Sequence, residues 1–137
     1  MKVILPAELY QEIYEAAKAV FPEEACGLIG GTEEDGVRQI KKVYVLENID
    51  HSNEHFTMAP KDQLAAVKDM RANGIKPLGN FHSHPESPSR PSDEDKRLAY
   101  DKNASYMIIS LMETNKPVLN CFHIEGDISI KEELEVQ

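Results

Sequence analysis

The chain contains few cysteines, with only Cys26 and Cys121 among its 137 residues. Two cysteines do not form the disulfide framework typical of small secreted domains, and a cytosolic protein keeps such thiols reduced. Long hydrophobic runs are also absent. The apolar stretch within residues 1–6 is too short for a secretory signal, and no later run approaches the roughly 18 residues of a membrane span. We therefore expect a soluble, cytoplasmic protein without a membrane partner.

Basic residues are scarce as well, because 15 lysines and arginines stand against 24 acidic residues, giving a formal net charge of −9. Such a surface repels nucleic-acid phosphates, which argues against a nucleic-acid partner and favours a basic substrate surface. No composition shift or internal repeat divides the chain. Its length and its 41% of hydrophobic residues are enough to bury one core, so we expect a single domain over residues 1–137.

Hydrophobic periodicity predicts an α/β fold in which a mixed, curved β-sheet is flanked by helices. Apolar residues at helical spacing predict helices over residues 6–20 and 60–73, the first of them preceded by a short strand. Core strands are expected at residues 25–30, 37–46, 75–81, 107–112, 118–124 and 128–130. We also expect a turn at residues 33–36, a short edge strand at 56–58, and a charged tail after residue 130.

The most informative segment is His82-Ser83-His84-Pro85, which is followed eleven residues after His84 by Asp95. Residues i and i+2 of a strand project to the same side, so the two imidazoles can reach one metal ion from a rigid backbone. Asp95 would supply a third ligand. Two nitrogens and one carboxylate oxygen fit a catalytic zinc site, because three protein ligands leave the fourth tetrahedral position open.

The residues between the histidines and Asp95 suit this arrangement. Pro88 and Pro91 follow Pro85, and each proline fixes φ and removes a backbone donor, so this segment is expected to be a stiff loop. Serine is a favoured N-cap residue, so a helix is expected to resume at Ser92 with acidic residues 93–95 in its first turn. Residues 98–99 are expected to begin an apolar face of this helix.

Simpler interpretations of these residues remain open. Ser92-x-x-Asp95 also resembles a capping box, which alone would explain both side chains. Two histidines at alternate positions can be ordinary polar side chains on an exposed strand face. The joint occurrence of the histidines, the stiff loop and the carboxylate favours the metal site.

The arrangement His82-Ser83-His84-Pro85 with Ser92-x-x-Asp95 resembles the JAMM motif of the MPN domain metalloproteases. That family carries an upstream glutamate in a Glu-x-Cys-Gly context before an apolar strand, and this chain has Glu24-Ala25-Cys26-Gly27. The resemblance covers nearly the whole chain, from the N-terminal helix to residues 121–124. It implies the MPN fold, which is cytidine-deaminase-like.

The resemblance also implies a role for each site residue. His82, His84 and Asp95 would bind Zn²⁺, which acts as a Lewis acid and lowers the pKa of a coordinated water molecule. Glu24 would serve as general base and then as general acid without binding the metal. Ser92 would donate its hydroxyl to the oxyanion of the tetrahedral intermediate.

Sequence order alone leaves Glu23 as an alternative to Glu24. The family pattern selects Glu24, and strand alternation would place Glu24 on the same side as Cys26 if the strand began that early. Cys26 could itself suggest a thiol nucleophile with a histidine base, but it lies in an apolar run without a sign of activation. The remaining histidines stand outside the site, namely His51, His55 and His123.

By resemblance, such domains hydrolyse amide or isopeptide bonds next to the C-terminal Gly-Gly of ubiquitin-like proteins. The short connections of this chain leave no room for the insertions of the eukaryotic deubiquitinating members. It is therefore similar to the compact prokaryotic type, whose members release cysteine or homocysteine from a small ubiquitin-like sulfur-carrier protein. The tail could add as a strand to an exposed sheet edge, and residues 50–58 are a candidate for that edge.

Two other functions are considered. The first is a zinc peptidase that acts on other peptides or on ubiquitin-like conjugates with the same chemistry. The second is a non-catalytic MPN scaffold, but such scaffolds typically lack the ligands that are present here. The sequence does not indicate an oligomeric state.

Overall fold

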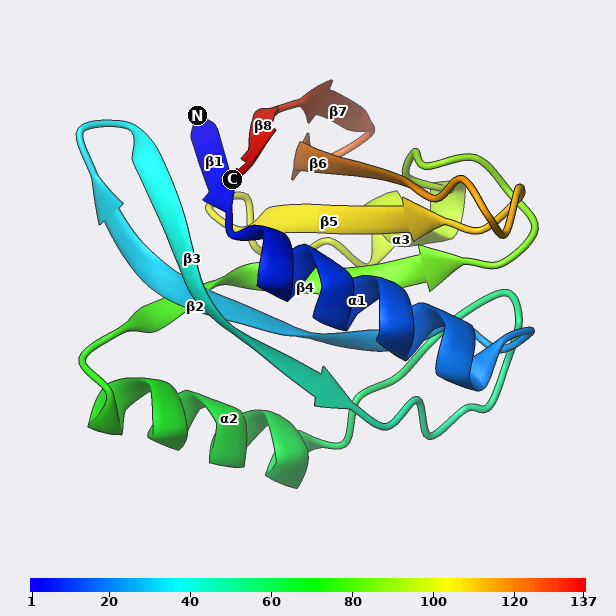
Figure 1. Cartoon of the computed structure of the whole chain (residues 1–137), viewed down its shortest axis with the longest axis horizontal. Helices are drawn as coiled ribbons and strands as arrows, with labels where there is room; N and C mark the ends of the chain where they lie inside the picture. The colour runs from blue at the N-terminus through cyan, green and yellow to red at the C-terminus, as the bar shows by residue number, and fades with distance from the viewer.

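The computed structural model describes residues 1–137, with all strands in one eight-stranded sheet and three helices packed on it (Figure 1). The strands are β1 (Lys2–Leu5), β2 (Cys26–Glu34), β3 (Val37–Leu46), β4 (Lys76–His84), β5 (Ser105–Ser110), β6 (Val118–Glu125), β7 (Ile128–Lys131) and β8 (Glu133–Val136). The helices are α1 (Ala7–Val20), α2 (Pro60–Ala72) and α3 (Asp93–Arg97). None of them is long and apolar enough to cross a membrane.

The sheet is mixed and strongly curved, with the strand order β7-β6-β5-β4-β2-β3-β1-β8. The β4–β5, β1–β3 and β1–β8 pairs are parallel and the other pairs are antiparallel. The two edge strands, β7 and β8, are separated by the single residue Glu132, so the curvature brings the sheet close to a barrel. The expected α/β fold with a mixed, curved sheet is confirmed.

Helix α1 covers one face of the sheet (Figure 1). It buries Leu9, Ile13 and Ala17, which follow one another at helical spacing, against a core that includes Phe81 and Met107 from β4 and β5. Alternation along β5 sends Ile108 to the other face, where it joins a second apolar cluster. This second face is the one on which the histidines lie.

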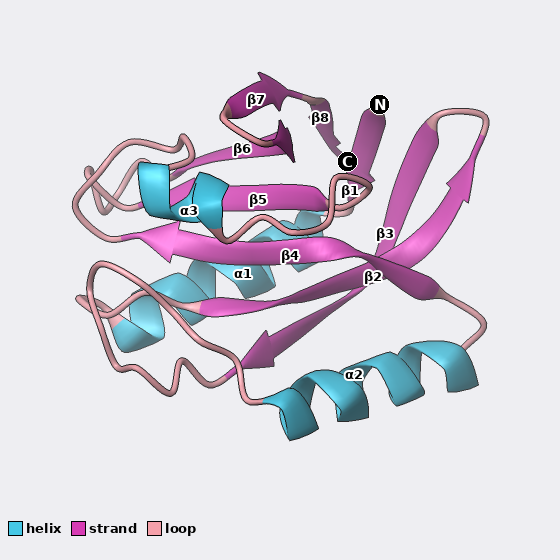
Figure 2. Cartoon of the chain, turned by 180° about the vertical axis from the view of Figure 1, so that it is seen from behind, coloured by secondary structure: helices cyan, strands magenta, loops and turns pink.

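Figure 2 shows the molecule from behind. In this view α3 lies over β4 and β5, while α2 runs along the β2–β3 side of the sheet. His82 is the partner of Ile108 in the β4–β5 register, and His84 follows it by two residues. Paired residues of neighbouring strands share a face, so both imidazoles lie on the side opposite α1. The short helix α3 is therefore next to them.

Two expected elements differ in the structure. Residues 56–58 form no strand, because this segment is held to Ile49 by a single backbone hydrogen bond and has no ladder partner. The expected charged tail is instead strand β8, in which Leu134 packs against the core while Glu133 and Glu135 form ion pairs with Lys2. Polar and apolar residues alternate in this segment, which is the pattern of a strand, but its many charged residues led to the prediction of a tail.

Some boundaries are also corrected. Strand β2 continues through Glu34, so the turn consists only of Asp35 and Gly36, both at positive φ. Helix α3 ends at Arg97, before the apolar face expected there. Leu98 is therefore 49% exposed, and of these two residues only Ala99 packs against the second apolar cluster.

Candidate metal centre

The end of β4 and the first turn of α3 bring together three side chains that could hold a metal ion. The Nε2 atoms of His82 and His84 are 3.1 Å apart, and Oδ2 of Asp95 lies 3.2 Å from the first and 3.0 Å from the second. Both histidines are buried, and Asp95 is partly buried. Three donor atoms thus form a nearly equilateral triangle.

This triangle fits zinc. Tetrahedral zinc with bonds of about 2.0–2.1 Å has ligand-to-ligand edges of about 3.3 Å, close to the three distances found here. Three donors occupy one face of such a tetrahedron and leave the fourth position open. Two imidazoles and one carboxylate also favour zinc over harder cations such as Mg²⁺ and Ca²⁺, which prefer oxygen ligands alone.

Neighbouring groups orient the two imidazoles. Nδ1 of His84 lies 2.8 Å from the carbonyl oxygen of Pro88, so this nitrogen donates its proton and Nε2 keeps its lone pair toward the triangle. The ring of His82 stacks on Phe56, with centroids 4.8 Å apart and planes 27° from parallel. Sequence reasoning missed Phe56 as a neighbour of the site, because its loop has no periodic pattern that indicates where an aromatic ring points.

Asp95 both caps α3 and belongs to the metal-binding triangle. Its backbone N–H donates to Oγ of Ser92 at 3.0 Å, and the Ser92 N–H donates to Asp95 Oδ2 at 2.9 Å, which completes a capping box. Burial raises the pKa of Asp95, but hydrogen bonds from His82, His84 and the Ser92 amide outweigh it and hold that pKa well below its usual range. The capping box and the metal triangle therefore coexist and share one oxygen atom.

Ser92 is exposed beside this triangle. Its Oγ accepts the Asp95 amide proton, and an accepting hydroxyl retains its own proton for donation. The capping role of Ser92 thus leaves the hydroxyl free to contact a substrate.

Glu24 is buried, with 4% of its surface exposed, and its Oε1 atom has no hydrogen-bond partner. Burial raises the pKa of Glu24 to about 8, against the opposing influence of His84, while Asp95 adds to the rise. Cys26, two residues later, is the partner of His82 in the β2–β4 register, so the chain at Glu24 runs close to the strand that bears the histidines. A buried carboxyl group without a partner is available for proton transfer.

Glu24 precedes β2, so strand alternation does not determine where its side chain points. Hydrogen bonds of the backbone around Glu24 hold it in place instead. The Glu24 N–H donates to the Ser52 carbonyl oxygen at 2.8 Å. Ser83, between the two histidines, accepts the Ala25 N–H with its Oγ at 2.7 Å and returns its own N–H to the Ala25 carbonyl. The segment bearing Glu24 is thereby tied directly to the strand bearing the ligands.

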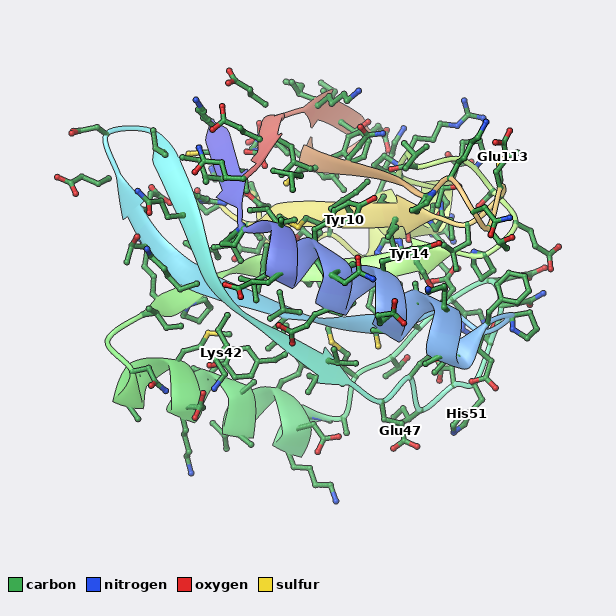
Figure 3. The ribbon with its side chains drawn as sticks, viewed as in Figure 1. Tyr10, Tyr14, Lys42, Glu47, His51 and Glu113 are labelled. Atoms are coloured by element: carbon green, nitrogen blue, oxygen red, sulfur yellow. The ribbon has the colours of Figure 1, made fainter.

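Glu23 interacts with a histidine that is not part of the triangle. Its carboxylate lies 3.1 Å from Nδ1 of His51, whose other ring nitrogen is 3.5 Å from Glu47. Figure 3 shows His51 and Glu47 together at the outer end of the structure. His55 interacts with Asp50, and the remaining histidine, on β6, approaches only Glu125, so neither belongs to the site.

Both cysteines are fully buried, and burial raises the pKa of Cys26 to about 12 and that of Cys121 well above its usual value. A thiol of this kind is protonated at neutral pH, and it is the thiolate that reacts. We therefore expect neither cysteine to be alkylated by iodoacetamide in the folded protein, whereas both react in denaturant. Intact-mass spectrometry checks this, and rapid single alkylation of the folded protein would reopen Cys26 as a nucleophile.

Comparison with known proteins gives a family match and curated relatives. Residues 6–124 match the family model described as prokaryotic homologs of the JAB domain. The chain is 24% identical over 134 residues to the CysO-cysteine peptidase of Mycobacterium tuberculosis, covering 98% of this chain and 90% of that protein. It is 30% identical over 102 residues to the desampylase of Pyrococcus furiosus, covering 68% of this chain and 70% of that protein.

Solved structures with the same fold are also found. The solution structure of protein DSY2949 from Desulfitobacterium hafniense is 49% identical and superposes with a TM-score of 0.91, covering all of this chain and 93% of that one. The JAB1/MPN domain protein AF2198 from Archaeoglobus fulgidus is 27% identical with a TM-score of 0.62, covering 99% of this chain and 98% of that one. The observed architecture is therefore the JAB1/MPN fold.

Proposed function

This chain belongs to the family of prokaryotic homologs of the JAB domain, and from that membership we propose a zinc-dependent hydrolase. Its substrate is the amide or isopeptide bond after the C-terminal Gly-Gly of a ubiquitin-like sulfur-carrier protein, from which it releases an amino acid such as cysteine or homocysteine. The observation that carries the proposal is the triangle of His82, His84 and Asp95, together with the buried Glu24, whose Oε1 has no hydrogen-bond partner and whose chain segment is bound to the histidine-bearing strand through Ser83.

The side chains divide the chemistry among them. His82, His84 and Asp95 hold Zn²⁺, which when bound supplies Lewis-acid activation of water. Glu24 takes up a proton on its carboxylate, whose buried Oε1 has no hydrogen-bond partner, and later delivers it to the leaving amine. Ser92 donates the free proton of its hydroxyl to the oxyanion that develops on the substrate carbonyl.

Support for the substrate comes from the relatives. The match to the CysO-cysteine peptidase spans almost the whole chain, and its name specifies hydrolysis of a cysteine adduct. The desampylase matches over about two thirds of the chain, and this favours other ubiquitin-like conjugates as the second candidate substrate. The complete set of ligands argues against a non-catalytic scaffold.

Mass spectrometry of a Gly-Gly carrier bearing a C-terminal cysteine or homocysteine tests the proposal. The carrier is incubated with the zinc-loaded protein and, in parallel, with its Glu24→Gln variant. We expect the carrier to lose one amino acid with the wild-type protein only. If the carrier stays intact but an isopeptide-linked conjugate is cleaved, the desampylase-type activity replaces the proposed one. If no substrate is cleaved by a fully zinc-loaded protein, the hydrolase proposal is wrong.

Zinc affinity is expected to fall as the pH falls through the pKa of His84. Burial lowers that pKa, but hydrogen bonds to Asp95 and the Pro88 carbonyl outweigh burial and raise it above its usual value of about 6.5. Below the raised pKa, zinc must displace a proton from His84, whereas above it the imidazole is neutral and ready to bind. Competition titrations with a zinc-binding dye from weakly alkaline to weakly acidic pH measure the trend. An affinity independent of pH over this range would contradict His84 as a ligand.

A further inference from the structure

Asn48 is a buried polar residue that follows β3 and lies outside the metal-binding triangle. Its side chain is packed into the loop of residues 47–59, and the residue is only 7% exposed. Its Nδ2 donates to the carbonyl oxygens of Glu24 at 3.0 Å and His55 at 3.1 Å, with that of Ser52 farther away at 3.5 Å. All of its bonds go to backbone groups, so Asn48 acts by fixing the course of the chain.

Asn48 binds the backbone on both sides of Phe56. Nδ2 holds the carbonyl of His55, the residue before Phe56, and Oδ1 accepts the N–H of Thr57, the residue after it, at 3.2 Å. Phe56 is the ring on which His82 stacks. The carboxamide therefore fixes both peptide groups that set where this ring lies, and the ring in turn supports a proposed zinc ligand.

A second set of bonds reaches Glu24. Asn48 holds the Glu24 carbonyl oxygen, while the Glu24 N–H is held by Ser52 of the same loop. Oδ1 of Asn48 also accepts the Asp50 N–H at 3.1 Å, which shapes the loop between these points. Both polar backbone groups of Glu24 thus depend on the loop that Asn48 organises.

We propose that Asn48 is a positioning residue for the hydrolysis, one that sets the Glu24 carboxyl group and the His82 imidazole relative to each other. This inference rests on the proposed function. The position needs two donors and an acceptor on one short side chain, and only asparagine provides them. Aspartate has nearly the same shape, but as a carboxylate it would lack both donors and would face two carbonyl oxygens that Nδ2 now satisfies.

The first test compares Asn48→Ala and Asn48→Asp with a matched control, Asn73→Ala. Asn73 also donates Nδ2 to a backbone carbonyl, that of Asp69 at 2.7 Å, but it does so at the exposed end of α2. We expect both Asn48 variants to retain zinc and to lose about 10–100-fold in kcat with little change in KM, the size seen when groups supporting a metal site are removed. The Asn73 variant should match the wild-type protein.

A double variant separates positioning from a general loss of stability. If Asn48 acts through Glu24, adding Asn48→Ala to Glu24→Gln should lower the residual activity by less than about threefold, because the group being positioned is already gone. If the two losses multiply, or if Asn48→Ala alone keeps kcat within about twofold of wild type, the proposal is wrong.

If the wild-type protein cleaves no substrate, that result counts against the proposed function alone. Two further measurements then still test the role of Asn48. Amide hydrogen exchange at Glu24 should be at least about tenfold faster in Asn48→Ala and unchanged in Asn73→Ala, although the acceptor of that amide is Ser52 and not Asn48 itself. The visible absorption bands of the Co²⁺-loaded protein should shift in the same direction in Asn48→Ala and in Phe56→Leu. Unchanged exchange together with an unchanged spectrum would overturn the assignment.

Discussion

Glu24→Gln is expected to lower turnover by about 10²–10⁴-fold in the zinc-loaded protein while leaving its zinc content unchanged. The substitution keeps the shape of the side chain but removes the atom that takes up and delivers the proton. Glu24 is not one of the three donors of the triangle, so the metal stays bound. Steady-state kinetics on the cleaved carrier, with zinc measured by inductively coupled plasma mass spectrometry on the same samples, gives both quantities.

Glu23→Gln is the matched control for this experiment. The two glutamates are neighbours in the chain, but Glu23 is partly exposed and interacts with His51, whereas Glu24 is buried with an unpaired oxygen. Glu23→Gln should therefore keep near wild-type turnover. Full activity in Glu24→Gln together with loss of activity in Glu23→Gln would reverse the assignment of the general base.

His82→Ala is expected to abolish both zinc binding and turnover. Removing one nitrogen leaves His84 and Asp95, and two protein ligands do not hold zinc against buffer and chelator. The substitution also deprives Phe56 of the ring on which it stacks. We expect less than about a tenth of the zinc stoichiometry of wild type after dialysis and no cleavage above background.

The control for this second experiment is His123→Ala. His123 also lies in a strand, β6, but it is partly exposed and its nearest acidic group is Glu125, 4.0 Å away. It should keep wild-type zinc content and turnover. If the His82 variant retained one zinc ion per chain, the set of ligands would have to be reassigned.

The metal-binding triangle could be predicted from the sequence because its geometry is local. His82 and His84 are two residues apart in a strand, and Asp95 is fixed by a capping box within its own helix turn. The location of Glu24 was expected from the family pattern. The condition on which strand alternation would apply to it is not met, because Glu24 precedes β2; its N–H instead donates to the Ser52 carbonyl, and Ser83 binds the backbone of the next residue, Ala25.

Contacts between distant segments could not be predicted in this way. Phe56 reaches His82 through a loop without periodicity, so its role depends on tertiary packing alone. The same limit affected the fold, since residues 56–58 looked like a strand but have no partner. Residues 133–136 alternate between charged and apolar side chains, as a strand does. Only their pairing with β1 in the structure shows that they form an edge strand of the sheet.

The parallel pairing of β1 with β8 has a consequence for how the protein is made. Lys2 is in register with Glu133, so β1 completes its hydrogen bonding only after β8 has been synthesised. Until then β1 has one partner, β3, and its other edge stays open to pairing with other chains. Contacts of such high sequence separation slow folding, and an unpaired strand edge favours association between chains until the β1–β8 pair forms.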